Sequence, residues 1–201
     1  MKHRICYFDL ETRKLASELS DDKKEGWRRL CAGEGGISAL CIYDTLQEWP
    51  YFYDDYTVQD AAAHLESADI VVGFRSDKFD RLVVEGILRR KLALKEHYDI
   101  FEMVKDALGV RKMVRGENTL DAICKRTLGK GKTGDGTHAP SLALENRWGQ
   151  LFNYCCQDVK LARDLFEYIR TEGGVIGPGM QFLPVILPEY LRREDGIRLN
   201  S

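Results

Sequence analysis

The sequence has no apolar run that approaches the ~20 residues of a membrane-spanning helix. Its first residues, Met-Lys-His-Arg, lead directly into a strand-like segment and not into the apolar stretch of a signal peptide. Neither charge sign dominates, since 30 lysines and arginines face 32 aspartates and glutamates, and a net charge of −2 neither favours nor excludes nucleic acid. These absences predict a cytoplasmic protein with no membrane association.

Motifs built on cysteine, histidine or a phosphate-binding loop are missing as well. The six cysteines contain no C-x-x-C pair and the four histidines no H-x-x-x-H pair, so no zinc site is expected and a reducing compartment is the simpler context. Residues 129–134 match G-x-G-x-x-G by letters but follow a helical pattern, which argues against a dinucleotide site. A P-loop would need glycine where Arg126 stands.

Length and hydrophobic periodicity predict one α/β domain. At ~150 residues per domain, a chain of 201 residues without repeats or linkers corresponds to a single domain over 1–201. The patterns predict a polar connection over 17–34, strands at 5–8, 36–43, 51–56 and 69–72, helices at 58–67, 79–87, 120–128 and 150–170, a loop over 129–140, and strand-like pieces at 175–176 and 182–187. Strands first and helices later indicate a mixed sheet with helices on both faces.

Two carboxylates lie at the end of the first predicted strand. Side chains alternate along a strand, so Asp9 and Glu11 share a face with Tyr7 and are about 6.6–7 Å apart along the chain. Two like charges repel there unless a positive group lies between them. A strand that runs out into solvent carries such acids too, and the pair alone does not define a site.

Two further acids stand in unusual positions. Asp158 falls within the apolar stripe of the 150–170 helix, one turn after Tyr154, and a buried charge is costly unless it is paired or coordinated. A salt bridge to a buried arginine is the alternative. Asp80 begins a predicted helix, where an acid also suits the helix dipole, and Asp77 is its nearest competitor for an acidic role.

Together these acids suggest a metal site. Carboxylate oxygens are the ligands that hard divalent cations prefer. Two Mg²⁺ or Mn²⁺ ions ~3.5–4 Å apart would activate a water and stabilise the leaving oxygen in phosphodiester hydrolysis. The four candidate ligands are Asp9, Glu11, Asp80 and Asp158.

The same acids lie in three segments that resemble the motifs of the DEDD 3′–5′ exonucleases. The segments are Phe8-Asp9-Leu10-Glu11-Thr12, Val72-Gly73-Phe74 through Phe79-Asp80, and Tyr154-Cys155-Cys156-Gln157-Asp158-Val159. The Tyr-x-x-x-Asp form of the third is typical of the tyrosine subgroup, DEDDy. Three intervening segments are similar to the exonuclease domains of B-family DNA polymerases and to related stand-alone or helicase-linked predicted exonucleases: Tyr98-Asp99-Ile100, Asn118-Thr119-Leu120-Asp121 and Thr127-Leu128-Gly129. The resemblance covers about residues 4–172 and leaves 173–201 as a C-terminal extension.

The resemblance implies a ribonuclease H-like mixed sheet flanked by helices and a two-metal 3′–5′ exonuclease. Asp9, Glu11, Asp80 and Asp158 would then hold the Mg²⁺ or Mn²⁺ ions directly or through water, and Tyr154 would orient the attacking water. The polymerase-like segments favour single-stranded DNA as substrate. An RNA exonuclease with the same site and a non-catalytic nucleic-acid-binding module are the alternatives, and a helicase or polymerase partner on another chain is compatible with either activity.

Basic residues cluster where a nucleic acid backbone would bind. Residues 111–132 contain seven lysines and arginines against two acids, a local charge of +5, although a solvated helix face would have the same composition. Arg75 stands where the family's second motif has asparagine or histidine, and we expect it to hold a phosphate. The candidate nucleic-acid contacts are Thr12, Phe74, Arg75, Asn118, Lys130 and Lys132.

Overall fold

A computed structural model describes residues 3–114, 116–131 and 139–193. A five-stranded sheet in the order β3-β2-β1-β4-β5 forms its centre. β1 is antiparallel to β2, and β2 to β3, whereas β4 is parallel to β1 and β5 to β4. The strands are β1 Ile5–Thr12, β2 Ile37–Asp44, β3 Trp49–Tyr53, β4 Ile70–Gly73 and β5 His97–Asp99. This is the ribonuclease H-like mixed sheet that the sequence predicts.

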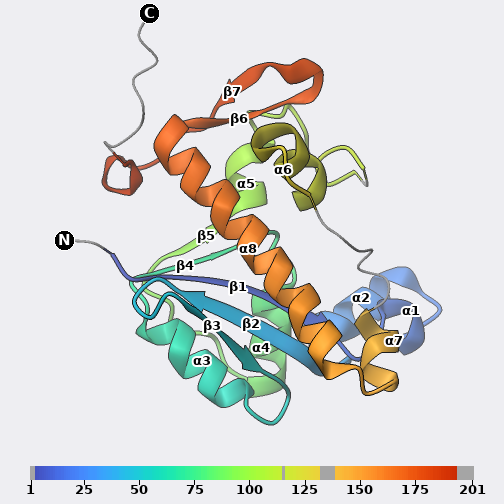
Figure 1. Ribbon diagram of the computed structural model, residues 1–201. Coiled ribbons are helices and arrows are strands. Elements are labelled where there is room, and N and C mark those ends of the chain that lie inside the picture. The colour runs from blue at the N-terminus through green and yellow to red at the C-terminus, as the bar shows by residue number, and fades with distance from the viewer. Residues whose placement is uncertain (1–2, 115, 132–138, 194–201) are drawn as a thin grey trace, which may run out of the picture.

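Helices cover both faces of the sheet (Figure 1). The long helix α8 (Trp148–Glu172) packs across β1 and β2 on one face, and α3 (Val58–Ser67) and α4 (Asp80–Leu88) pack on the other. The remaining helices are α1 Ala16–Leu19, α2 Lys23–Cys31, α5 Ile100–Lys105, α6 Leu120–Leu128 and α7 Ala139–Leu144. A small hairpin of β6 (Gly174–Ile176) and β7 (Phe182–Pro184) follows α8, with short 3-10 turns at Pro178–Met180 and Glu189–Leu191.

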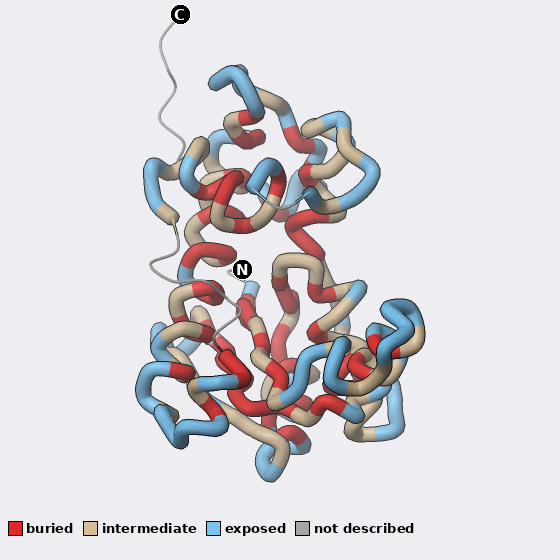
Figure 2. Tube along the Cα trace, turned by 90° about the vertical axis from the view of Figure 1, so that its right-hand side faces the viewer, coloured by how far each residue is buried: buried red, intermediate tan, exposed pale blue. Residues whose placement is uncertain are grey.

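The alternation of side chains along β1 divides the core into two layers. Ile5 and Tyr7 belong to the layer under α8, while Phe8 and Leu10 belong to the layer under α3 and α4. Figure 2 shows that the buried parts of the trace lie in the interior, with exposed parts on the outer turns and helices. Each large apolar side chain buried in this way contributes about 1.5–3 kcal/mol to the free energy of folding. Side chains on both faces of β1 therefore stabilise the fold.

Several elements differ from the sequence prediction. The polar connection predicted over 17–34 contains α1 and α2, which were missed because α2 buries only Gly26 and Leu30 and otherwise carries polar side chains. The loop predicted over 129–140 overlaps the start of α7, and β5 and α5 were not predicted because each is only a few residues long. Among the described residues, no helix combines the length and hydropathy of a membrane span.

Candidate metal centre

Three of the four predicted carboxylates meet where β1 passes beneath α8. Asp9 and Glu11 are half-buried on a strand whose other residues are buried, and they pair across the sheet with Cys41 and Ala39 of β2. These small neighbours leave room for Asp158, which projects from α8 and is only 4% exposed. One ligand oxygen from each of Asp9, Glu11 and Asp158 lies within 4.8 Å of the others, so the group could hold a metal ion.

The electrostatic surroundings of this group favour a cation. The thiol of Cys155 on α8 donates a hydrogen bond to the main-chain oxygen of Asp9 at 3.2 Å. Burial raises the pKa of Cys155, and the negative charges of Asp9, Glu11 and Asp158 raise it further. Carboxylates gathered this closely repel one another, and a divalent cation among them would remove that repulsion. The contact of Cys155 with β1 was not predicted from the sequence.

Asp80, the fourth predicted ligand, lies beside this group but outside it. It begins α4, is 3% exposed, and its Oδ1 accepts a hydrogen bond from the backbone N–H of Leu10 at 3.1 Å. Burial raises the pKa of the Asp80 carboxyl to about 7, although the hydrogen bonds from its own N–H and that of Leu10 oppose the shift. Because Leu10 stands between Asp9 and Glu11, Asp80 is attached to the same stretch of β1. Its role as a metal ligand stays a prediction.

Asp99 organises the loop that leads to Asp80. Its buried carboxylate accepts hydrogen bonds from the N–H groups of Arg75 at 2.8 Å and Asp77 at 3.1 Å, and it also caps α5 through Phe101 N at 2.9 Å. Burial raises the pKa of Asp99, against the effect of these hydrogen bonds. Sequence reasoning did not assign Asp99 a role. The sequence carried two signals there: the resemblance of Tyr98-Asp99-Ile100 to polymerase exonuclease segments, and an acid directly before a short apolar stretch, the usual place of a helix N-cap.

The remaining catalytic candidate, Tyr154, is half-buried on α8 one turn before Asp158. This position on the helix agrees with the sequence expectation, and the role in orienting water is untested. Thr12 is buried at the end of β1, and its hydroxyl donates to the main-chain oxygen of Lys14 at 2.8 Å.

The other nucleic-acid candidates are spread more widely. Phe74 packs edge-on against Phe101, with ring centres 5.8 Å apart, at the border of the core. Asn118 is buried, and its amide donates to the main-chain oxygen of Lys112, so it has a structural contact. Lys130 is exposed, with its Nζ 3.6 Å from Asp164. None of these contacts tests nucleic-acid binding.

Two candidates in the loops remain. Arg75 adopts a left-handed backbone conformation with φ of 62°, stabilised by the bond from its N–H to Asp99, and its guanidinium lies 3.8 Å from the sulfur of Met113. Lys132 lies outside the described residues.

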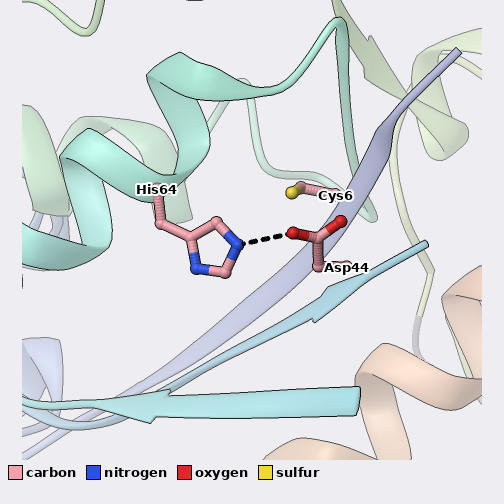
Figure 3. Close-up of side chains that lie close together, drawn as sticks. All are labelled: Cys6, Asp44 and His64. Atoms are coloured by element: carbon pink, nitrogen blue, oxygen red, sulfur yellow. Dashed lines mark hydrogen bonds and ion pairs between the residues drawn. The ribbon is translucent and has the colours of Figure 1, made fainter. Parts of the chain in front are cut away.

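A second group of metal-ligand types occupies the other end of β1 (Figure 3). His64 of α3 points at Asp44, with Nε2 3.0 Å from a carboxylate oxygen, and Cys6 lies beside them. Arg4 also binds Asp44, through Nε at 3.1 Å and a terminal nitrogen at 2.6 Å, and Tyr53 contacts His64 Nδ1 at 2.9 Å. Arg4 therefore already supplies the positive charge that a cation would bring. We interpret this group as a structural network held by Arg4.

Comparisons with known proteins support the fold. No protein-family model matches the chain, and no curated protein matches it in sequence. Solved structures do match, among them the family B DNA polymerase from the hyperthermophilic archaeon Pyrobaculum calidifontis, with a TM-score of 0.61 and 14% identity. The match covers 84% of this chain and 25% of the polymerase, so the chain spans about a quarter of that protein. At this identity the likeness establishes the fold alone. The polymerase, an enzyme that acts on nucleic acid, shares this fold over the matched part.

Proposed function

We propose that this protein is a metal-dependent 3′–5′ exonuclease that removes nucleotides from the 3′ end of single-stranded DNA. The observation that carries the proposal is the convergence of Asp9, Glu11 and Asp158 within 4.8 Å, in a fold shared with a family B DNA polymerase. Oxygen donors without histidine or cysteine suit Mg²⁺ or Mn²⁺. An RNA exonuclease with the same residues is the alternative.

The proposed reaction is hydrolysis of the last phosphodiester bond. Water forms the new oxygen–phosphorus bond, the bond from phosphorus to the 3′ oxygen of the preceding nucleotide breaks, and that oxygen takes a proton, releasing a nucleoside 5′-monophosphate. Two divalent ions would supply charge neutralisation and a more acidic water. Asp9, Glu11 and Asp158 would hold these ions together with Asp80, and the hydroxyl of Tyr154 would orient the water for attack in line with the leaving oxygen.

The preference for DNA over RNA rests on the resemblance of the sequence to polymerase exonuclease segments. Contacts with the strand are assigned to Thr12 beside Glu11 and to Arg75 beside the loop of Asp80, and Lys130 would add charge. A cytoplasmic location and a helicase or polymerase partner on another chain are part of the same proposal.

The test uses 5′-labelled single-stranded DNA and RNA of one sequence, each incubated with Mg²⁺, Mn²⁺ or EDTA. We expect a ladder that shortens from the 3′ end of the DNA with either metal and not with EDTA. Asp9→Ala, checked for folding by circular dichroism, is expected to give no ladder. Faster degradation of RNA would favour the alternative substrate. No degradation of either strand would contradict the enzymatic proposal and favour a nucleic-acid-binding module.

A further inference from the structure

A cleft of about 610 Å³ opens beside the candidate metal centre. It is lined by Glu11 and Thr12 of β1, by residues of α1, α2 and the turns around them, and by Phe79, the residue before α4. The volume lies within the range of about 300–1,000 Å³ that is usual for small-molecule pockets. A molecule in this cleft would therefore lie next to a carboxylate of the metal centre.

One wall of the cleft is aromatic. Trp27 of α2 stacks on Phe79, with ring centres 5.2 Å apart and planes 25° from parallel. Trp27 is 40% exposed, much more than the core residues, so part of its indole surface faces the solvent. Leu15 and Leu30 extend this wall with apolar surface, and Leu15 is also exposed. Flat, partly exposed aromatic surface is what a planar ligand requires for stacking.

The backbone fixes the position of Trp27. A Cβ atom on the preceding residue, Gly26, would lie 2.3 Å from the main-chain oxygen of Ala16. Glycine at this position therefore lets α1 and α2 approach closely, and Asp22 caps α2 by accepting from Glu25 N at 2.7 Å. Phe79 is fixed independently, because Asp80 next to it is bonded to β1. Two elements distant in sequence thus build one stacking surface.

The rest of the lining is polar. Ser17 and Ser20 bring hydroxyl groups, Asp21 a carboxylate and Lys23 an ammonium group. A nucleobase combines a flat apolar face with polar edges, and these walls offer both kinds of contact. Stacking accepts any base, since every base has a π face.

We propose that this cleft binds a nucleobase at the 3′ end of the strand being hydrolysed, with Trp27 as its stacking residue. The proposal rests on the proposed exonuclease function for the identity of the strand. It adds a binding residue from α2, a segment outside the three acidic motifs. The base would stack on the Trp27–Phe79 pair. The attached phosphate would lie at the carboxylates of the metal centre, of which Glu11 also lines the cleft.

The experiment compares two 5′-labelled strands of the same sequence, one of which lacks only the base of its 3′-terminal nucleotide. Wild type, Trp27→Ala, Trp27→Phe and Trp49→Ala are measured for KM and kcat. Trp49 is a matched control, because it is exposed and pairs with Asp44 at the other end of the sheet.

With the complete strand, Trp27→Ala is expected to raise KM by about 5- to 150-fold, with a smaller change in kcat, because stacking on an aromatic side chain contributes that much to the binding of a base. Trp27→Phe should recover most of the loss and Trp49→Ala should match wild type. With the strand that lacks the base, wild type and Trp27→Ala should have the same KM. An unchanged KM of an active Trp27→Ala on the complete strand overturns the proposal.

A second measurement separates this proposal from the exonuclease proposal. If wild type degrades no strand, thymidine 5′-monophosphate is titrated in EDTA while tryptophan fluorescence is recorded. Quenching that disappears in Trp27→Phe but persists in Trp49→Phe supports the base site even without hydrolysis. Absence of quenching in wild type counts against the base site.

Discussion

The carboxylate of Asp80 accepts a hydrogen bond from the backbone N–H of Leu10, with 3.1 Å between Oδ1 and the nitrogen. β4 pairs with β1 only as far as Tyr7, so further along β1 the side chain of Asp80 takes the place of a strand partner. The first and second acidic motifs are therefore joined by a direct bond. Any change at Asp80 alters both the charge of the site and the support of the strand that carries Asp9 and Glu11.

Asp80→Asn is expected to change how stability depends on pH. The folded protein raises the pKa of this carboxyl from 3.8 to about 7 through burial, so it favours the protonated form. Stability from this group is complete below about pH 4 and is lost as the pH rises towards 7. Asparagine stays neutral, so in EDTA the Tm of Asp80→Asn should rise relative to wild type between these values. The exposed Asp60→Asn serves as control, and equal pH profiles for wild type and Asp80→Asn would contradict the assignment.

Asp9→Ala and Asp158→Ala should each lower the cleavage rate by more than about a hundredfold while the fold stays intact. The loss of a direct metal ligand should lower the rate more than the 10–100-fold that is usual when a residue hydrogen-bonded to a ligand is replaced. In EDTA both variants should melt no lower than wild type, because each removes one of three like charges within 4.8 Å. Added Mn²⁺ should raise the Tm of wild type only. Glu145→Gln, at an exposed acid outside this group, should behave as wild type, and a Tm increase with Mn²⁺ in Asp9→Ala would argue against the site.

Tyr154→Phe should lower kcat by about a hundredfold, since it removes one hydroxyl that positions the water. The ring stays in place on α8, so metal binding should be unaffected. Single-turnover rates together with the Mn²⁺-induced shift in Tm measure the two effects separately. A full wild-type rate would rule out the proposed role of the hydroxyl, and a lost metal response would assign Tyr154 to metal binding.

Asp99→Ala should destabilise the protein by about 3 kcal/mol, because it leaves the N–H groups of Arg75 and Asp77 without their acceptor. Asp99→Asn keeps one acceptor oxygen, so its free energy of unfolding should fall by less than that of Asp99→Ala. Urea unfolding gives the free energies, and cleavage assays should show that both variants also lose activity as the loop before Asp80 loosens. A normal rate in a folded Asp99→Ala would show that the loop does not depend on this carboxylate.

Asp44→Ala should cost about 3 kcal/mol or more, because it removes the partner of Arg4 and His64 in a buried network. Urea unfolding measures this loss. Zn²⁺ should not raise the Tm of wild type through this group, since Arg4 already neutralises Asp44. A Zn²⁺-dependent increase in Tm that is lost in Cys6→Ala would instead identify a metal site here.

The sequence by itself predicted the long, strongly patterned elements. The 58–67 helix matches α3, the apolar stripe over 150–170 matches most of α8, and the apolar run over 5–8 matches the first half of β1. It also predicted that Asp9, Glu11, Asp80 and Asp158 belong together, because an acid on an apolar strand or helix stands out in a linear pattern. In the structure Asp9, Glu11 and Asp158 converge, whereas Asp80 lies outside their group.

Only the tertiary structure decided the features that depend on two distant segments. Trp27 could not be assigned from the sequence, because a polar helix that buries only Gly26 and Leu30 has little periodicity. Its stacking on Phe79 arises only when α2 packs beside α4. The same holds for Asp99, whose acceptor role is defined by backbone N–H groups 22 and 24 residues earlier in the chain. Hydrophobic pattern encodes which face of an element is buried, but contacts between faces exist only once the chain has folded.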